Sequence, residues 1–136
     1  MREHEYETEI DTRLEGKLGF DRVRTFVADR CSTEYGVTRV TEERFSNDPK
    51  VIRERLALTD EMRLIVMFEE NFPTNGYIDC LDFLKPLEKT GYTIDILSLG
   101  KLRTMVETVR KLTNFFMSIK DGVYPNLKRV SAPVLG

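Results

Sequence analysis

The sequence has few of the residues on which most catalytic and metal centres depend. Its 136 residues include one histidine, two cysteines and no tryptophan. Nucleophilic catalysis by Ser or Cys normally needs a histidine base, and the single His4 precedes the first convincing helical pattern. Cys31 and Cys80 are too far apart for a zinc knuckle, so we expect two free, buried thiols. We therefore predict no catalytic, cofactor-binding or metal-ligating residue in this chain.

Long apolar runs and a strong charge of either sign are also absent. The longest mainly apolar run, residues 64–68, is far shorter than the ~20 residues that cross a bilayer. The first five residues are largely charged and no apolar stretch follows them, which argues against a secretory signal. A net charge of −2 gives no overall positive field for nucleic acid or an anionic membrane. These features predict a cytoplasmic chain without a membrane partner.

The apolar residues that are present recur at spacings of three and four, which is typical of amphipathic helices. The pattern predicts helices at 21–31, 49–68 and 95–120, with shorter ones after residue 33, near 81–87 and, for about one turn, after Tyr124. We expect an all-α fold, an irregular bundle of four to six helices. Its two long amphipathic helices, 49–68 and 95–120, should pack their apolar stripes against each other and against the helix at 21–31. The stripe of the first contains Ile52, Leu56, Met62, Ile65 and Val66, and that of the second contains Leu99, Leu102, Met105, Val106, Val109, Leu112, Phe116 and Ile119.

The starts of three helices can be predicted from their capping residues. Asp21 is a good N-cap for the first helix, and Ser32 or Thr33 for the second, because their side-chain oxygens can accept from free backbone N–H groups. Asp48 and Pro49 make the clearest boundary, since the carboxylate can cap the helix and proline fits its first turn. A long helix should therefore begin at Pro49.

Two segments lack a strong helical pattern. Residues 1–17 are predicted to be a flexible or weakly helical leader, and residues 18–136 the helical core. Residues 71–76 contain proline followed by Asn-Gly, which removes a backbone donor and favours positive φ, so we expect an irregular loop there. The conformation of residues 71–94 beyond this loop is left open.

Partial motifs for nucleotide and cation binding are weak. Gly100 and Lys101 lack the second glycine and the following hydroxyl of a nucleotide-binding loop, so we expect Lys101 to be a surface lysine. The acidic pairs at 42–43 and 69–70 diverge on a helix, because adjacent residues do not face each other. We therefore predict solvated charge at both pairs rather than a cation site.

A basic strip on the 95–120 helix allows two interpretations. Arg103, Arg110 and Lys111 could contact phosphates, and binding would then weaken with salt. Glu107 shares this face, however, and mixed charges four residues apart are typical of a self-paired, solvated surface. We favour the self-paired surface, with direct DNA binding as the alternative.

Five short sequence motifs follow one another along the chain. They are LGFDRV at 18–23, CSTEYG at 31–36, NDPKVI at 47–52, TDEMR at 59–63 and YPNL at 124–127. Their order resembles the N-terminal region of the MutS-two proteins, the bacterial MutS paralogues that lack the mismatch-reading N-terminal domain. The similarity covers about residues 17–130, which is nearly the whole chain.

The resemblance implies a function that composition alone does not. In that family this region resembles the start of the helical core and lever, which connect an ATPase domain to a DNA clamp, and a nuclease domain often follows. The chain would then be a non-catalytic fragment of a longer DNA repair and recombination-suppressing ATPase that binds structured DNA and, in some members, stalled ribosomes. ATP and Mg are implied for the full-length protein and not for this segment.

The resemblance also implies the partners. They would be the remaining domains of the parent chain and, through the full-length protein, DNA; a homodimer is left open. The alternative hypothesis is a stand-alone helical adaptor that binds a protein partner through a helix-in-groove contact.

Overall fold

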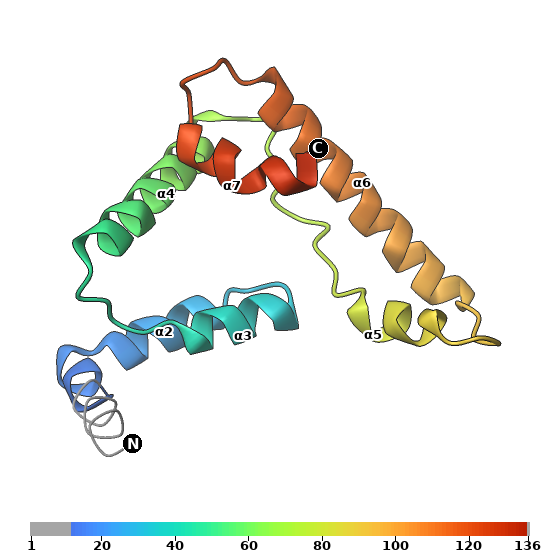
Figure 1. Ribbon diagram of the computed structural model, residues 1–136, viewed down its shortest axis with the longest axis horizontal. Helices are drawn as coiled ribbons and strands as arrows, with labels where there is room; N and C mark the ends of the chain where they lie inside the picture. Colours follow the sequence, from blue (N-terminus) through green and yellow to red (C-terminus); the bar gives the residue numbers. More distant parts are fainter. Residues whose placement is uncertain (1–11, 136) are drawn as a thin grey trace. The chain divides into compact units, whose positions relative to one another are not determined.

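The computed structural model describes residues 12–135 (Figure 1), and this part of the chain is helical without any strand. The predicted all-α class is confirmed, although the helices slightly outnumber the four to six expected. Residues 12–18 are helical. They are followed by α2 (Phe20–Ala28), α3 (Glu34–Glu42), α4 (Pro49–Phe68), α5 (Leu81–Leu84), the 3₁₀ helix η1 (Lys85–Glu88), α6 (Ile96–Ser118) and α7 (Pro125–Leu135). No helix in the described range is long and apolar enough to cross a membrane.

The chain divides between Asn47 and Asp48 into two compact units. The first unit contains the helix at 12–18, α2 and α3, and α2 packs against α3. The second unit contains α4 to α7. Of the predicted leader, residues 1–11 lie outside the described residues, and the helix at 12–18 belongs to the first unit.

Two caps in the first unit have different outcomes. Asp21 does not cap α2, so that prediction is wrong: the helix begins one residue earlier, after Gly19, whose φ of 74° is left-handed. Glycine adopts this conformation without a Cβ penalty, which leaves Asp21 in the first turn. The Thr33 cap is confirmed, since its hydroxyl oxygen accepts from Gly36 N at 3.0 Å.

The long helices of the second unit begin where local chemistry predicts. Asp48 accepts from Lys50 N at 2.9 Å ahead of Pro49. Asp95 accepts from Ser98 N at 2.7 Å. α4 ends at Phe68 as expected, and α6 ends at Ser118, two residues before the predicted end.

The packing of the long helices corrects the predicted bundle. Their main packing partner is α7, which contacts both α4 and α6 (Figure 1), so their apolar stripes do not run along each other. They share only a small core made by Ile65 of α4 with Phe115 and Phe116 of α6. α7 itself has eleven residues where one turn was expected. α2 lies in the first unit, where α3 is its packing partner.

The segment between α4 and α5 is an irregular loop, as predicted for residues 71–76, and it is fixed to α6. Phe72 packs edge-on against Phe115, with 5.2 Å between ring centroids. Gly76 has the predicted positive φ, 86°, and its carbonyl oxygen accepts from the buried Thr108 hydroxyl at 2.7 Å. A Cβ at Gly76 would collide with Thr108 Oγ1, so only glycine fits here without displacement.

Candidate interaction faces

Few apolar side chains are buried in the described part of the chain. Among residues 12–135, only Ile65, Phe115 and Phe116 are buried apolar residues. By contrast, 23 large hydrophobic side chains in this part of the chain are exposed. Much apolar surface of the individual helices is therefore uncovered.

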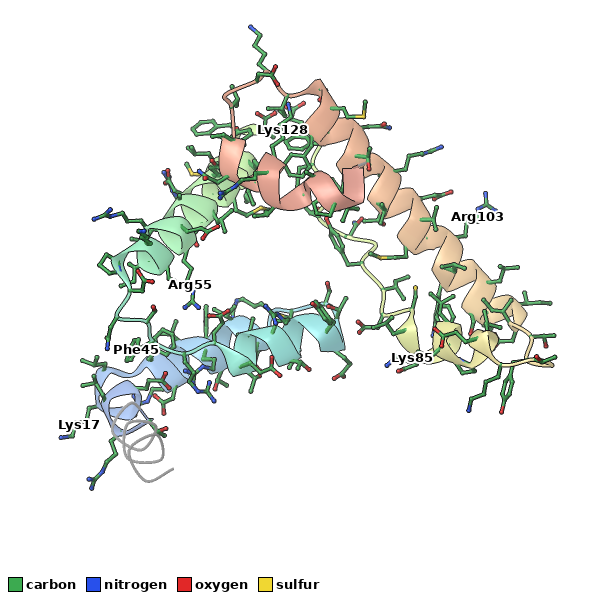
Figure 2. All side chains as sticks on the ribbon, viewed as in Figure 1. Lys17, Phe45, Arg55, Lys85, Arg103 and Lys128 are labelled. Carbon is green, nitrogen blue, oxygen red and sulfur yellow. The ribbon has the colours of Figure 1, made fainter. Side chains whose placement is uncertain are left out.

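One candidate face lies on α6, and we call it the outer face of α6: Leu99, Arg103, Val106, Arg110 and Met117. These residues follow one another at three, four or seven positions, so they share one side of the helix. Leu99 is 52% exposed, Val106 59% and Met117 72%. Figure 2 shows Arg103 projecting from α6 on the side away from α7. Leu99 and Val106, two members of the predicted core stripe, are therefore at the surface.

Apolar side chains are also exposed on α4, but they do not share one side of the helix. Of the predicted stripe, Ile65 is buried, whereas Leu56 and Val66 are more than 60% exposed. Phe68, the last residue of the helix, is 69% exposed, and it lies on the opposite side from Val66, because residues two positions apart do not face the same way. α4 therefore exposes apolar side chains singly rather than as one face.

The junction between α4 and α7 depends on Glu61, which was not among the residues predicted to have a role. Glu61 is buried, and its carboxylate accepts from Asn126 N at 3.0 Å, Asn126 Nδ2 at 2.9 Å and Leu127 N at 2.7 Å. These backbone donors are free at the start of a helix and attract negative charge. Glu61 therefore caps α7 from another helix. Its position four residues before Ile65, on the apolar side of α4, could have indicated that its side chain is buried.

Two further contacts hold α7 to α4. The Tyr124 hydroxyl donates to Glu69 Oε1 at 3.0 Å, and burial together with this carboxylate raises the pKa of Tyr124. Glu69 therefore accepts a hydrogen bond at the junction of α4 and α7, which corrects the prediction of solvated charge for that residue. Arg129 pairs with Glu54 at 3.2 Å on the exposed side. The Glu61 cap and these two contacts hold the start of α7 against α4.

The first unit has a charged centre. Arg24 Nη2 lies 2.7 Å from Glu15 Oε2, and Phe45 N donates to Glu15 Oε1 at 3.3 Å. Burial alone would raise the pKa of Glu15, but the hydrogen bonds from Arg24 and Phe45 and the charges of Arg24 and Arg44 lower it below its ordinary 4.5. A cavity of about 350 Å³ lies beside this pair, between α2 and the end of α3. It is lined by Asp21, Arg24, Thr25, Ala28, Thr41 and Arg44.

The cysteines are free, as predicted, but they are half-buried rather than buried. Cys31 Sγ lies 3.5 Å from Val27 O at the end of α2, and Cys80 Sγ lies 3.5 Å from Ile78 O. Within the described residues, no group of three or more His, Cys, Asp or Glu side chains is placed to hold a metal.

The basic strip on α6 is only partly self-paired. Arg103 Nε lies 3.6 Å from Glu107 Oε1, which agrees with the favoured interpretation. Arg110, Lys101 and Lys111 are exposed and have no acidic partner among the described residues. α6 thus presents more positive charge than it neutralises.

Comparison of this chain with models of protein families, with curated proteins and with solved structures finds no match.

Proposed function

We propose that the chain is a non-catalytic helical segment of a MutS-like DNA repair ATPase, and that other domains of that protein cover its exposed apolar side chains. The observation that carries the proposal is the exposure of apolar side chains on one side of α6, from Leu99 to Met117, together with that of Leu56, Val66 and Phe68 on α4. Apolar side chains gathered on one exposed face of a small protein mark an interaction site. The choice of the MutS-like family rests on the order of the five sequence motifs.

The geometry of the second unit suits a lever. α4 has 20 residues and α6 has 23, so they are about 30 Å and about 35 Å long. Both contact α7 near the core of Ile65, Phe115 and Phe116 and near the Glu61 cap; we call this region the hub. Two stiff arms joined at a buried hub can carry a movement from one end to the other, because close-packed cores transmit displacement. ATP, Mg and DNA would be bound by other domains of the parent protein.

The test compares the isolated chain with the full-length protein encoded by its reading frame. Hydroxyl-radical footprinting would report the oxidation of Met117 and Phe68, which are 72% and 69% exposed. We expect both to be protected at least about fivefold in the full-length protein, because an interface core excludes water. Phe115, which is buried at the hub, should react equally slowly in both proteins and is the control. Equal oxidation of Met117 and Phe68 in both would contradict the proposal.

The catalytic part of the proposal has a separate check. The isolated chain should hydrolyse no ATP and nick no branched DNA. Activity that a point substitution in this chain abolishes would place a catalytic centre here and would overturn the proposal.

A stand-alone adaptor is the second candidate, and the heptad-like spacing of the outer face of α6 favours it. Such spacing is how one helix receives another. A reading frame that stops directly after Gly136 would support the adaptor. A frame that continues into a Gly-x₄-Gly-Lys-Ser/Thr motif would support the MutS-like segment.

A further inference from the structure

The outer face of α6 combines apolar and positively charged side chains in one register. Leu99, Val106 and Met117 supply exposed apolar groups, and Arg103 and Arg110 lie between them on the same side of the helix. Leu99 to Val106 and Arg103 to Arg110 are both steps of seven residues. A seven-residue repeat faces one partner helix along its length.

The charge of α6 differs from that of the rest of the chain. α6 carries four basic residues and one acidic residue, a net charge of +3, although the whole chain carries −2. Glu107 offsets one arginine of the face, Arg103, at a distance of 3.6 Å. Arg110 has no acidic partner in the described part of the chain. Positive charge on an exposed interface selects a partner of negative charge, because complementary potentials accelerate encounter and exclude like-charged surfaces.

We propose that the outer face of α6 docks an acidic amphipathic helix, whose apolar residues cover Leu99, Val106 and Met117 and whose carboxylates pair with Arg103 and Arg110. The inference deepens the proposed function and rests on it, since it assigns a partner chemistry to this exposed face. Nucleic acid fits the face less well, because phosphates would pair with the arginines and leave the apolar side chains uncovered. A partner helix satisfies both kinds of side chain.

The experiment uses two synthetic helical peptides of about three heptads each. They share the same apolar residues and differ only in Glu or Lys at the flanking positions. Binding of fluorescently labelled peptide to the chain is measured by anisotropy at low salt. We expect the Glu peptide to bind at least about tenfold more tightly than the Lys peptide, because arginine pairs with one and repels the other.

Two matched double variants locate the effect on the helix. In Arg103→Glu with Arg110→Glu, the preference for the Glu peptide should be lost or reversed. The control variant is Lys101→Glu with Lys111→Glu, which changes the net charge of α6 by the same amount. Both lysines are one or two residues out of register with the outer face, so the preference for the Glu peptide should remain. Val106→Ser should weaken the binding of both peptides about threefold or more, since it removes apolar contact area. Circular dichroism confirms helix content, and Arg103→Ala with Arg110→Ala replaces the charge reversal if that variant unfolds.

Several outcomes would overturn the inference. They are equal binding of the two peptides, equal effects of the two double variants, or loss of branched-DNA binding in the arginine variant when neither peptide binds. The last outcome would identify a phosphate-binding face. If these peptides fail while Met117 is protected in the full-length protein, the proposed function stands and only the acidic character of the partner is wrong.

Discussion

The two units of the chain differ in what lies at their centres. In the described part of the first unit, the one buried side chain is Glu15, which pairs with Arg24. In the second unit, Ile65, Phe115 and Phe116 form an apolar core. Apolar burial stabilises through the area removed from water and does not require a partner of opposite charge. A buried carboxylate stabilises only while its partners remain in place.

This difference extends to how the helices of each unit are joined. In the first unit, Glu15 links the helix at 12–18 to α2 and to the segment after α3. In the second unit, the carboxylate of Glu61 caps α7, and the unit also has a buried apolar core. Both units thus use a glutamate as a connector. In the first unit the Phe20 and Phe45 rings pack together and Arg24 lies over Phe20, but no apolar side chain of the described part is buried. We expect the second unit to resist perturbation of its polar groups better than the first.

The largest expected effect is in the apolar core. Phe115→Ala removes a 3% exposed ring that contacts both Phe72 and Phe116 edge-on, and it should lower the free energy of unfolding by about 3–5 kcal/mol. Urea unfolding followed by circular dichroism measures the loss. Phe68→Ala, at an exposed position, should cost less than about 0.5 kcal/mol. Peptide-resolved hydrogen exchange should show the loss in the second unit alone; equal loss in the first would break the distinction between the units.

The next effect tests the glutamate of the second unit. Glu61→Ala leaves the donors of Asn126 and Leu127 without their buried acceptor, which should cost about 2–3 kcal/mol. Amide protection should fall first in α7, while α4 keeps most of its protection. Glu54→Ala, which breaks the exposed pair with Arg129, should cost about 1 kcal/mol or less. If both variants behave alike, the cap contributes no more than a surface ion pair.

The third prediction compares, at two glycines of the second unit, the cost of a steric clash with the cost of positive φ alone. Gly76 and Gly91 both have φ near 90°, but only at Gly76 would a Cβ meet another residue, Thr108. Gly91→Ala should cost about 1 kcal/mol from the positive φ alone, and Gly76→Ala about 2 kcal/mol, because the loop must also move away from α6. Equal melting temperatures of the two variants would show that the loop is not fixed against Thr108.

Of the three predicted caps, which all depend on neighbouring residues, two are confirmed, and Asp21 fails because α2 begins after Gly19. Thr33 and Asp48 cap helices through residues two or three positions away, so the sequence alone indicates them. Glu61 acts on residues 65 and 66 positions away, and no local pattern predicts that distance. Its effect is a cap at the start of α7.

Burial of the apolar stripes was not predictable for a related reason. A stripe of period 3.6 shows that a helix can bury one face, but it does not say against what. The stripes of α4 and α6 were expected to cover each other, whereas α7 contacts both and leaves Leu56, Leu99 and Val106 at the surface. The exposed members of these stripes are thus a part of the predicted core that the described chain does not cover.

The smallest expected effect is the pH dependence of the first unit. The pKa of Glu15 is lowered in the folded chain because its hydrogen bonds and the charges of Arg24 and Arg44 outweigh burial. A carboxyl group with a lowered folded pKa contributes its full stabilisation above its unfolded pKa, and the contribution is lost as the pH falls through the folded pKa. Hydrogen-exchange protection of α2 and α3 should therefore be constant near neutrality and fall as the pH is lowered below about 4.5.

Two variants decide whether Glu15 causes this loss. Glu15→Gln keeps the size of the side chain but cannot form the ion pair with Arg24, so its first unit should be weaker at neutral pH and should change less on acidification. Glu42→Gln, at an exposed position of α3, should follow the wild-type protein throughout. If the Glu15 variant loses protection as steeply as the wild type, then acid acts through other carboxylates. The charged centre would then not be what distinguishes the first unit from the second.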